Sequence, residues 1–286
     1  MKVAVIGPGR VGTLVAVTAV RAGHRVVAVA GGSETSRRRF TGLAAGVRPL
    51  DSVADAARVA ELVLLAVPDD AIKTVATELV RADAVGAQRF VHFSGVHSHQ
   101  VLSSLAAAGG HIAACHPAMT VPEGAHDPEL LHGTAWAITA PAAERDWVHD
   151  LVADLGGDGF DVPADRRALY HAGLSLGSNA VAAATAAARQ LLLAANVDDP
   201  ARFLTPLAHA SVDNIAARGA SAITGPIARG DVGTIGTHLE TIADDLPALT
   251  DPYMHLSTAI LDVVRAGLDP DDAAALAQAL SVQHER

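Results

Sequence analysis

The sequence is poor in cysteine, in aromatic residues and in basic charge. Cys115 is the only cysteine among 286 residues, so the chain can form neither an internal disulfide nor a cysteine cage for a metal or cluster. Acidic residues outnumber basic ones by 31 to 21, which argues against binding nucleic acid through bulk positive charge. Only 3% of the residues are aromatic whereas 50% are hydrophobic, so we expect a core of closely packed Ala, Val and Leu.

Long hydrophobic runs are also missing. The apolar N-terminal segment, residues 1–6, is broken at once by Gly7-Pro8-Gly9. It is much shorter than the hydrophobic part of a secretory signal or a membrane span. We therefore expect a soluble, cytoplasmic protein that has neither a membrane nor a nucleic acid as partner.

Lysine is nearly absent, since Lys2 and Lys73 are the only two in the chain. No residue beyond position 73 can therefore act as a lysine general acid. A proton needed there must come from histidine, a hydroxyl group, a carboxylic acid or water. His116 and His171 are the candidates, because an ordinary histidine titrates near neutral pH.

Strand-like and helical segments alternate in the first half of the chain. Apolar runs at 3–6, 25–30, 62–67 and 90–93 are nearly unbroken, which is typical of parallel strands covered on both faces. Further strands are expected at 112–115, 135–139 and 160–162, and after Pro163 the pattern is helical only. We predict an α/β protein with a doubly wound, parallel Rossmann domain over residues 1–163 and an all-helical domain over residues 164–286.

A glycine-rich turn follows the first predicted strand and opens the first predicted helix. Its sequence, Gly7-Pro8-Gly9-Arg10-Val11-Gly12, matches the G-x-G-x-x-G pattern. In that context the glycines allow a tight turn, close approach of a pyrophosphate and close packing of helix on strand. We predict that these six residues bind a dinucleotide, the alternative being a purely structural turn.

The second predicted strand ends without the acidic residue that would hold the ribose hydroxyls of NAD. Gly31-Gly32-Ser33 stands there instead, and Arg37 and Arg38 follow. A hydroxyl and two guanidinium groups are suited to a ribose phosphate, so Ser33, Arg37 and Arg38 favour NADP(H). Glu34 could still supply the missing acid, which leaves NAD or no preference as the alternative.

Loops beyond the carboxyl ends of parallel strands are where open α/β sheets bind ligands. Three of the predicted strands lead into such loops, with Val67-Pro68 and Ser94-Gly95 expected at the cofactor and His97, His116 and Thr120 at the substrate. His97, His99 and His116 also allow a metal site. We expect none, because no further ligand stands at a convincing spacing.

The predicted helix after Pro163 carries polar residues at four-residue intervals. His171, Ser175 and Asn179 would share one face of an otherwise Ala- and Leu-rich helix. Buried polar groups need partners, and a substrate is one such partner. The alternatives are a neighbouring subunit or the loop at 224–226.

The chain resembles a family of bacterial Rossmann-like proteins described as NADP-dependent oxidoreductases, whose all-helical C-terminal domain has no assigned function. The motifs behind the resemblance cover nearly the whole chain: Gly7–Gly12, Val91–Gly95, His116–Thr120, the helix from Tyr170-His171 to Ser178-Asn179, and Thr224–Asp231. The resemblance implies a fold similar to 6-phosphogluconate dehydrogenase, the β-hydroxyacid dehydrogenases and ketopantoate reductase. It also implies a homodimer paired through the helical domain.

The better-known relatives carry a Lys-x-x-x-Asn motif on a helix of the second domain. Asn179 matches its asparagine, whereas Ser175 stands at the place of its lysine. The resemblance thus implies that Asn179 orients the substrate. Either His116 or His171 replaces the lysine, or the reaction needs less acid catalysis, as in hydride transfer to a cationic iminium, or the protein binds without turnover. Thr224 and Arg229 are expected to contact an anionic group of the substrate.

We therefore predict an NADP(H)-dependent oxidoreductase that transfers a hydride to a small carbonyl substrate. A 2-oxo acid such as ketopantoate is the specific candidate. The alternatives are an imine reductase and a protein that binds or senses NADP(H) without turnover.

Overall fold

A computed structural model describes residues 1–44 and 46–281 of the chain. It divides into two compact units, Met1–Ser175 and Leu176–Arg286, and residues 282–286 of the predicted helical domain lie outside the described part. The predicted boundary at 163/164 lies twelve residues earlier than this division. The difference arises because helix α7 (Arg167–Ser175) packs on the first unit through the buried Arg167.

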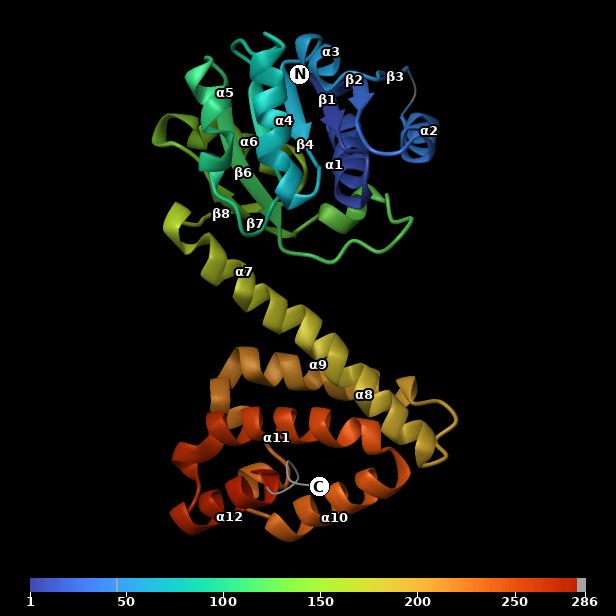
Figure 1. Cartoon of the computed structure of the whole chain (residues 1–286), viewed down its shortest axis with the longest axis vertical. Coiled ribbons are helices and arrows are strands. Elements are labelled where there is room, and N and C mark those ends of the chain that lie inside the picture. The colour runs from blue at the N-terminus through green and yellow to red at the C-terminus, as the bar shows by residue number, and fades with distance from the viewer. Residues whose placement is uncertain (45, 282–286) are drawn as a thin grey trace. The chain divides into compact units, whose positions relative to one another are not determined.

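The first unit is built on a sheet of eight described strands in the order β3-β2-β1-β4-β5-β6-β7-β8 (Figure 1). All neighbouring strands pair in parallel except β6 and β7. The predicted doubly wound, parallel sheet is therefore confirmed, with one antiparallel pair, β6 and β7, that the sequence did not predict. The connection between β6 and β7, residues 118–134, contains only a short turn of helix at Pro128–Leu131, and not the α-helix that usually carries the chain across to a parallel neighbour. The strands are β1 (Lys2–Ile6), β2 (Arg25–Ala30), β3 (Arg48–Pro49), β4 (Leu62–Leu65), β5 (Arg89–His92), β6 (His111–Pro117), β7 (Ala135–Thr139) and β8 (Asp158–Asp161).

Helices cover both faces of the sheet, as the unbroken apolar strands predict. Along β1, Val3 and Val5 pack with α1 (Arg10–Arg21), α2 (Glu34–Leu43) and α6 (Arg145–Asp154). Ala4 and Ile6 point to the other face and pack with α3 (Val53–Arg58), α4 (Asp69–Arg81) and α5 (Ser103–Ala107). This alternation follows from the two-residue period of a strand.

The carboxyl ends of β1, β4, β5 and β6 lie side by side at one edge of the sheet, because these strands are parallel neighbours. The direction in which strands are added changes at β1. The chain first adds β2 and β3 on one side of β1, and then β4 and the later strands on the other side. Ligands of open α/β sheets bind at such a switch point. The glycine-rich turn and the loops after β4, β5 and β6 therefore share one edge.

The second unit is helical. It begins with a π-helical turn, η5 (Leu176–Ala180), and continues through α8 (Val181–Ala194), α9 (Ala201–Arg218), α10 (Val232–Asp245), α11 (Thr250–Val264) and α12 (Pro270–Ser281). Its core lies between α10, α11 and α12, where Ile235, Met254 and Leu276 pack together. Every described residue of α8 and α9 is at least partly exposed.

Within the described residues, no helix combines the length and the apolar character needed to cross a membrane.

Candidate functional site

The glycine-rich turn has the backbone geometry of a pyrophosphate cradle. Gly7 has φ +92°, and a Cβ there would lie 2.6 Å from the carbonyl oxygen of Ala66; a Cβ on Gly12 would overlap the carbonyl oxygen of Gly7. A Cβ on Gly9 would meet no described atom within 4 Å, so open space lies before the N-terminus of α1. Free N–H groups at a helix N-terminus attract an anion.

The other predicted residues of the turn surround it. A Cγ atom of Val67 lies 3.0 Å from the position of a Cβ on Gly7, so the loop after β4 borders the turn, and Pro68 stands at the start of α4. Arg10 is exposed and donates a hydrogen bond to the carbonyl of Val121, while Val11 packs on the core of the sheet. The loops after β1 and β4 therefore meet at the cradle.

The turn after β2 presents Arg37 where a ribose phosphate is expected. Gly31 and Gly32 both have positive φ, and Pro8 packs beside Gly32, which joins this turn to the cradle. Ser33 caps α2 by accepting the N–H of Ser36. The guanidinium of Arg37 donates to the carbonyl of Gly32 at 3.0 Å.

Arg38 and Glu34 form an ion pair with each other. The pair is exposed, measures 2.5 Å and joins side chains one turn apart on α2. Arg37 has a more distant acidic neighbour, because its guanidinium lies 3.7 Å from a carboxylate oxygen of Asp51. The turn after β2 therefore holds Arg37 at Gly32, whereas Arg38 pairs closely with Glu34.

Helix α7 brings three polar side chains to the sheet edge. Arg167, Tyr170 and His171 share one helix face by their three- and four-residue spacing. The hydroxyl of Tyr170 is hydrogen-bonded to Nδ1 of His116, at 2.9 Å. The ring of His171 stands edge-on to that of His116 with 5.9 Å between centroids. Both predicted histidines therefore lie in one cluster, together with a tyrosine.

The backbone of Gly95 lies directly against the two histidine rings of this cluster. A Cβ there would overlap the ring of His171 and lie 3.1 Å from Nε2 of His116. The backbone after β5 consequently touches both rings. The sequence motif Ser94-Gly95 is needed for this approach, because any side chain at position 95 would push the histidines away.

Arg167 is buried, with 1% of its surface exposed. Its guanidinium donates to the carbonyl of Ala137 at 3.0 Å and to the carbonyl of Ser94, and its Cζ lies 5.5 Å from the centre of the Tyr170 ring. In the sequence Tyr170 stands out only as part of a family motif, without a role, and Arg167 does not stand out at all. The spacing of both to His171 has meaning only once the helix is known to pack on β5 and β6.

Hydrogen bonds fix the loop that contains Ser94. His92 accepts the N–H of Ser94 through Nδ1 and donates from Nε2 to the carbonyl of Ser98, which requires one neutral tautomer. The hydroxyl of Ser94 accepts the N–H of His97. The side chain of His97 is half-buried beside this loop.

The surroundings favour neutral His116 and His92 and a protonated Tyr170. Burial lowers the pKa of His116 to about 4, and the charges of Arg167 and His171 act in the same direction. Burial lowers the pKa of His92 to about 3. Burial raises the pKa of Tyr170, which Arg167 partly opposes. At neutral pH His116 is therefore an uncharged hydrogen-bond partner of an intact phenol.

Five predicted residues lie outside this cluster. Thr120 is exposed in the loop after β6, and Ser175 ends α7. Asn179, Thr224 and Arg229 belong to the second unit, where all three are exposed. The π-helical turn η5 breaks the regular helix at 176–180, so the predicted four-residue spacing between Ser175 and Asn179 does not place them on one regular α-helical face.

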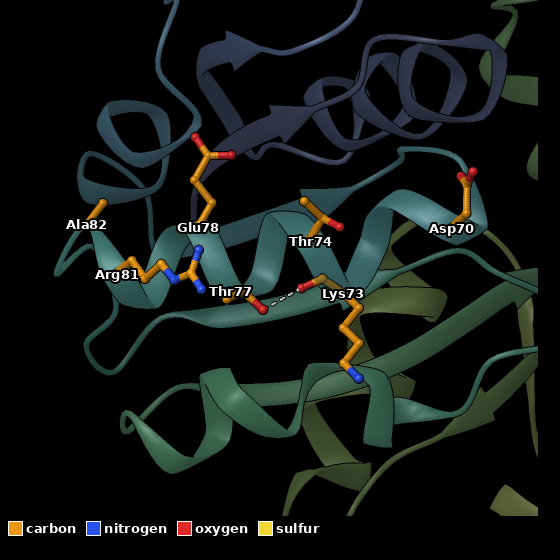
Figure 2. Close-up of a pocket in the computed structure, with 7 residues that line it drawn as sticks. All are labelled: Asp70, Lys73, Thr74, Thr77, Glu78, Arg81 and Ala82. Atoms are coloured by element: carbon orange, nitrogen blue, oxygen red, sulfur yellow. Dashed lines mark hydrogen bonds between the residues drawn. The ribbon is translucent and has the colours of Figure 1, made fainter.

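An open hollow of about 750 Å³ runs along α4. Figure 2 shows Lys73, Glu78 and Arg81 on this helix; its one dashed line is the hydrogen bond from Thr77 to the carbonyl of Lys73. The helix runs from the carboxyl end of β4 back toward the opposite edge of the sheet, where Arg81 lies. The hollow is a solvated helix face with charges of both signs.

Comparison with known families divides the chain in two. Residues 1–117 match a Rossmann-like domain, and residues 134–260 match a domain of unknown function, DUF2520. The DUF2520 match begins one residue before β7, so Arg167, Tyr170 and His171 lie within it, whereas Gly95 and His116 lie within the Rossmann-like match. The cluster thus draws residues from both matched ranges.

Solved structures share this fold over most of their length. BF3122 from Bacteroides fragilis, described as a candidate NADP oxidoreductase, matches with 23% identity and a TM-score of 0.75, covering 91% of this chain and 97% of that one. An imine reductase from Myxococcus stipitatus in complex with NADP+ has 17% identity, a TM-score of 0.71, and coverage of 98% and 100%. The Streptomyces aurantiacus imine reductase has 20% identity, a TM-score of 0.67, and coverage of 97% and 99%. At these identities the likeness establishes the fold alone. No curated protein matches the chain.

Proposed function

We propose that this protein is an NADP(H)-dependent oxidoreductase that transfers a hydride between the nicotinamide and a small carbonyl substrate. The observation that carries the proposal is the Tyr170–His116 hydrogen bond at the sheet edge that also bears the glycine cradle. A proton-bearing pair and a cradle for a dinucleotide are the two parts that such a reaction needs. The names of the structural neighbours, which include an NADP+ complex, support the proposal.

The cofactor residues follow from the fit of the cradle. Gly7, Gly9 and Gly12 would accept the pyrophosphate. The space beside Gly9, before the N-terminus of α1, is open, and a side chain at this position would occupy it. Ser33 and Arg37 would bind the ribose phosphate of NADP(H). NADPH, when bound, supplies the hydride.

Tyr170 is the proposed proton donor. The neutral state of His116 makes an imidazolium donor scarce at neutral pH, whereas the phenol of Tyr170 keeps its proton. His116 would orient the phenol through Nδ1, and Arg167 would hold helix α7 against the carbonyls of Ser94 and Ala137. This assignment replaces His116 and His171 as direct donors and keeps both as groups bordering the substrate.

The remaining predicted roles are proposals based on the sequence and the resemblance. Asn179 would orient the substrate, with Ser175 near it along the chain. His97 and Thr120, on the loops after β5 and β6, would contact the substrate, as would Thr224 and Arg229 through its anionic group. A 2-oxo acid such as ketopantoate remains the specific candidate.

A homodimer through the helical unit is also proposed. Helices α8 and α9 expose large apolar side chains, among them Phe203, Leu207 and Val212. Such a row is a typical site for a second copy of the same chain. The mass in solution tests this proposal, and a mass of one subunit at micromolar concentration would contradict it.

Imine reduction is the second candidate function, favoured by the names of two structural neighbours. Titration of the purified protein with NADPH and with NADH, followed by fluorescence, tests the cofactor. Oxidation of NADPH with ketopantoate then tests the carbonyl function, and oxidation that needs an added amine would indicate the imine function. Binding of neither cofactor would overturn both, and binding without turnover would favour a sensing protein.

A further inference from the structure

Arg167 is a buried cation with no acidic partner in contact. Among the described residues, no carboxylate oxygen lies within 4 Å of its guanidinium, and its two hydrogen bonds go to neutral carbonyls. Its Nε is buried without a hydrogen-bond partner in the same part of the chain. A guanidinium stays charged at neutral pH, so an uncompensated positive charge lies beside the proposed proton donor.

The groups around Arg167 do not cancel this charge. Tyr170 and His171 on α7, His116 and Cys115 on β6 and His92 on β5 are neutral or cationic groups. Among the residues that the structure describes, Asp69 at the start of α4 is the carboxylate that acts on both Arg167 and His116, and it does so from an exposed position. Solvent screens an exposed carboxylate more than it screens a buried guanidinium. The field in the cluster is therefore positive.

A positive field has opposite effects on the two candidate reactions, reduction of a carbonyl and reduction of an iminium. When a hydride adds to a carbonyl carbon, negative charge develops on the oxygen, and a fixed cation stabilises it. When a hydride adds to an iminium, the substrate enters with a positive charge that the same cation repels. At about 6 Å and an effective dielectric constant of about 20, the interaction of two unit charges changes an equilibrium by roughly a hundredfold. Partial charges and screening reduce this to about tenfold.

We propose that Arg167 makes this site selective for a neutral carbonyl group over an iminium. The inference rests on the proposed function, because it concerns the group that accepts the hydride. In the reduction, a C–H bond forms at the carbonyl carbon and the electron pair of the C=O π bond moves to oxygen. Oxygen takes the proton of the Tyr170 hydroxyl, which is regained from solvent by way of His116, and NADPH is oxidised to NADP+. Arg167 moves no proton itself; its positive charge stabilises the negative charge that develops on the oxygen.

The experiment compares two probes of equal ring size, cyclopentanone and 1-pyrroline, with the full-length protein and NADPH. We expect kcat/KM for the ketone to exceed that for the imine. Arg167→Gln keeps a hydrogen-bond donor and removes the charge, and it is expected to lower kcat/KM for the ketone about tenfold more than for the imine. Arg167→Lys keeps the charge and should retain the ratio. An imine preference in the unaltered protein, or an equal loss for both probes in Arg167→Gln, would overturn the inference.

A binding measurement separates this inference from the proposed function. With NADP+ present, calorimetry compares acetate, an oxyanion, with pyrrolidinium, a cation. Tighter binding of acetate, with the preference reduced about tenfold in Arg167→Gln, is the expected result. Tighter binding of pyrrolidinium would overturn the inference without any need for turnover. If the protein binds NADPH but reduces neither cyclopentanone, nor 1-pyrroline, nor ketopantoate, the proposed function is refuted. The substrate assignment then falls with it, whichever of acetate and pyrrolidinium binds more tightly.

Discussion

The hydroxyl of Tyr170 and Nδ1 of His116 lie 2.9 Å apart, although 54 positions separate them in the chain. The tyrosine comes from α7 and the histidine from the end of β6. Helix α7 is held there by Arg167, which joins the carbonyls of Ser94 and Ala137. The contact therefore depends on three strands and one helix meeting at a single edge of the sheet.

Replacement of Tyr170 by Phe should remove the proposed proton donor and keep the ring. We expect kcat to fall by about 10²-fold or more, the usual contribution of a general acid, while the affinity for NADPH stays unchanged. Steady-state kinetics and NADPH titration measure the two quantities. Tyr253→Phe is the matched control, because Tyr253 is the only other tyrosine and is likewise hydrogen-bonded to a histidine, His238. Equal loss in both variants would contradict the assignment.

Gly95→Ala should disturb the cluster without removing any polar group. The added Cβ would overlap the ring of His171 and crowd Nε2 of His116, so one of the rings must move. We expect at least a tenfold fall in kcat/KM, because misplacement by about 1 Å is costly to a reaction that depends on orientation. Gly173→Ala on α7 is the control, since its Cβ meets no described atom within 4 Å. Full activity of Gly95→Ala would show that the approach of this backbone does not matter.

Arg37 and Arg38 should differ in their effect on the cofactor. The guanidinium of Arg37 donates to the carbonyl of Gly32 and lies 3.7 Å from a carboxylate oxygen of Asp51, whereas Arg38 forms a close ion pair of 2.5 Å with Glu34. We expect Arg37→Gln to weaken NADPH binding about tenfold or more, as loss of a charge-assisted contact does, and to leave NADH binding nearly unchanged. Arg38→Gln should have a smaller effect. Fluorescence titration with both cofactors checks this, and a larger effect of Arg38→Gln would reverse the assignment.

Acid should destabilise the first unit through its buried histidines. The pKa of His116 is about 4 and that of His92 about 3 in the folded protein, against about 6.5 in the unfolded chain. The unfolded state therefore binds more protons between these values, so the free energy of unfolding falls as the pH drops from about 6.5 toward 4. His116 alone should contribute about 2 kcal/mol, allowing for its partial exposure.

Thermal denaturation between pH 4 and 7 measures this effect. His116→Asn cannot take up the proton, so its midpoint should vary less with pH than that of the unaltered protein. His209→Asn, at an exposed position of α9, is the control and should leave the pH dependence as it is. An unchanged pH dependence in His116→Asn would mean that His116 does not titrate in this range.

Local sequence signals predicted the parts of the site that short segments build. The glycine turn at Gly7–Gly12 needs only its own strand and helix, so the pattern of glycines predicts it. The contact of Arg37 with Gly32 is likewise local, whereas its role at a ribose phosphate stays a prediction. The apolar strands predicted the sheet, but the reversal of β7 depends on how the chain between β6 and β7 packs, and nothing local marks it.

The cluster of Arg167, Tyr170 and His116 could be predicted only in part. His116 and His171 were singled out by their chemistry, but the proton-bearing pair needs a contact across 54 residues, and Arg167 gives no sign in the sequence that it is buried without an acid.

The sequence by itself determined the glycine-rich turn, the helical second half and the exclusion of a lysine donor beyond residue 73, because these depend on residue type and on spacing within one or two elements. Only the tertiary structure decided that Tyr170 stands at His116 and that Arg167 leaves a positive charge in the cluster. Charge and proton affinity depend on what surrounds a group in space, and burial and partners arise only when distant segments pack together.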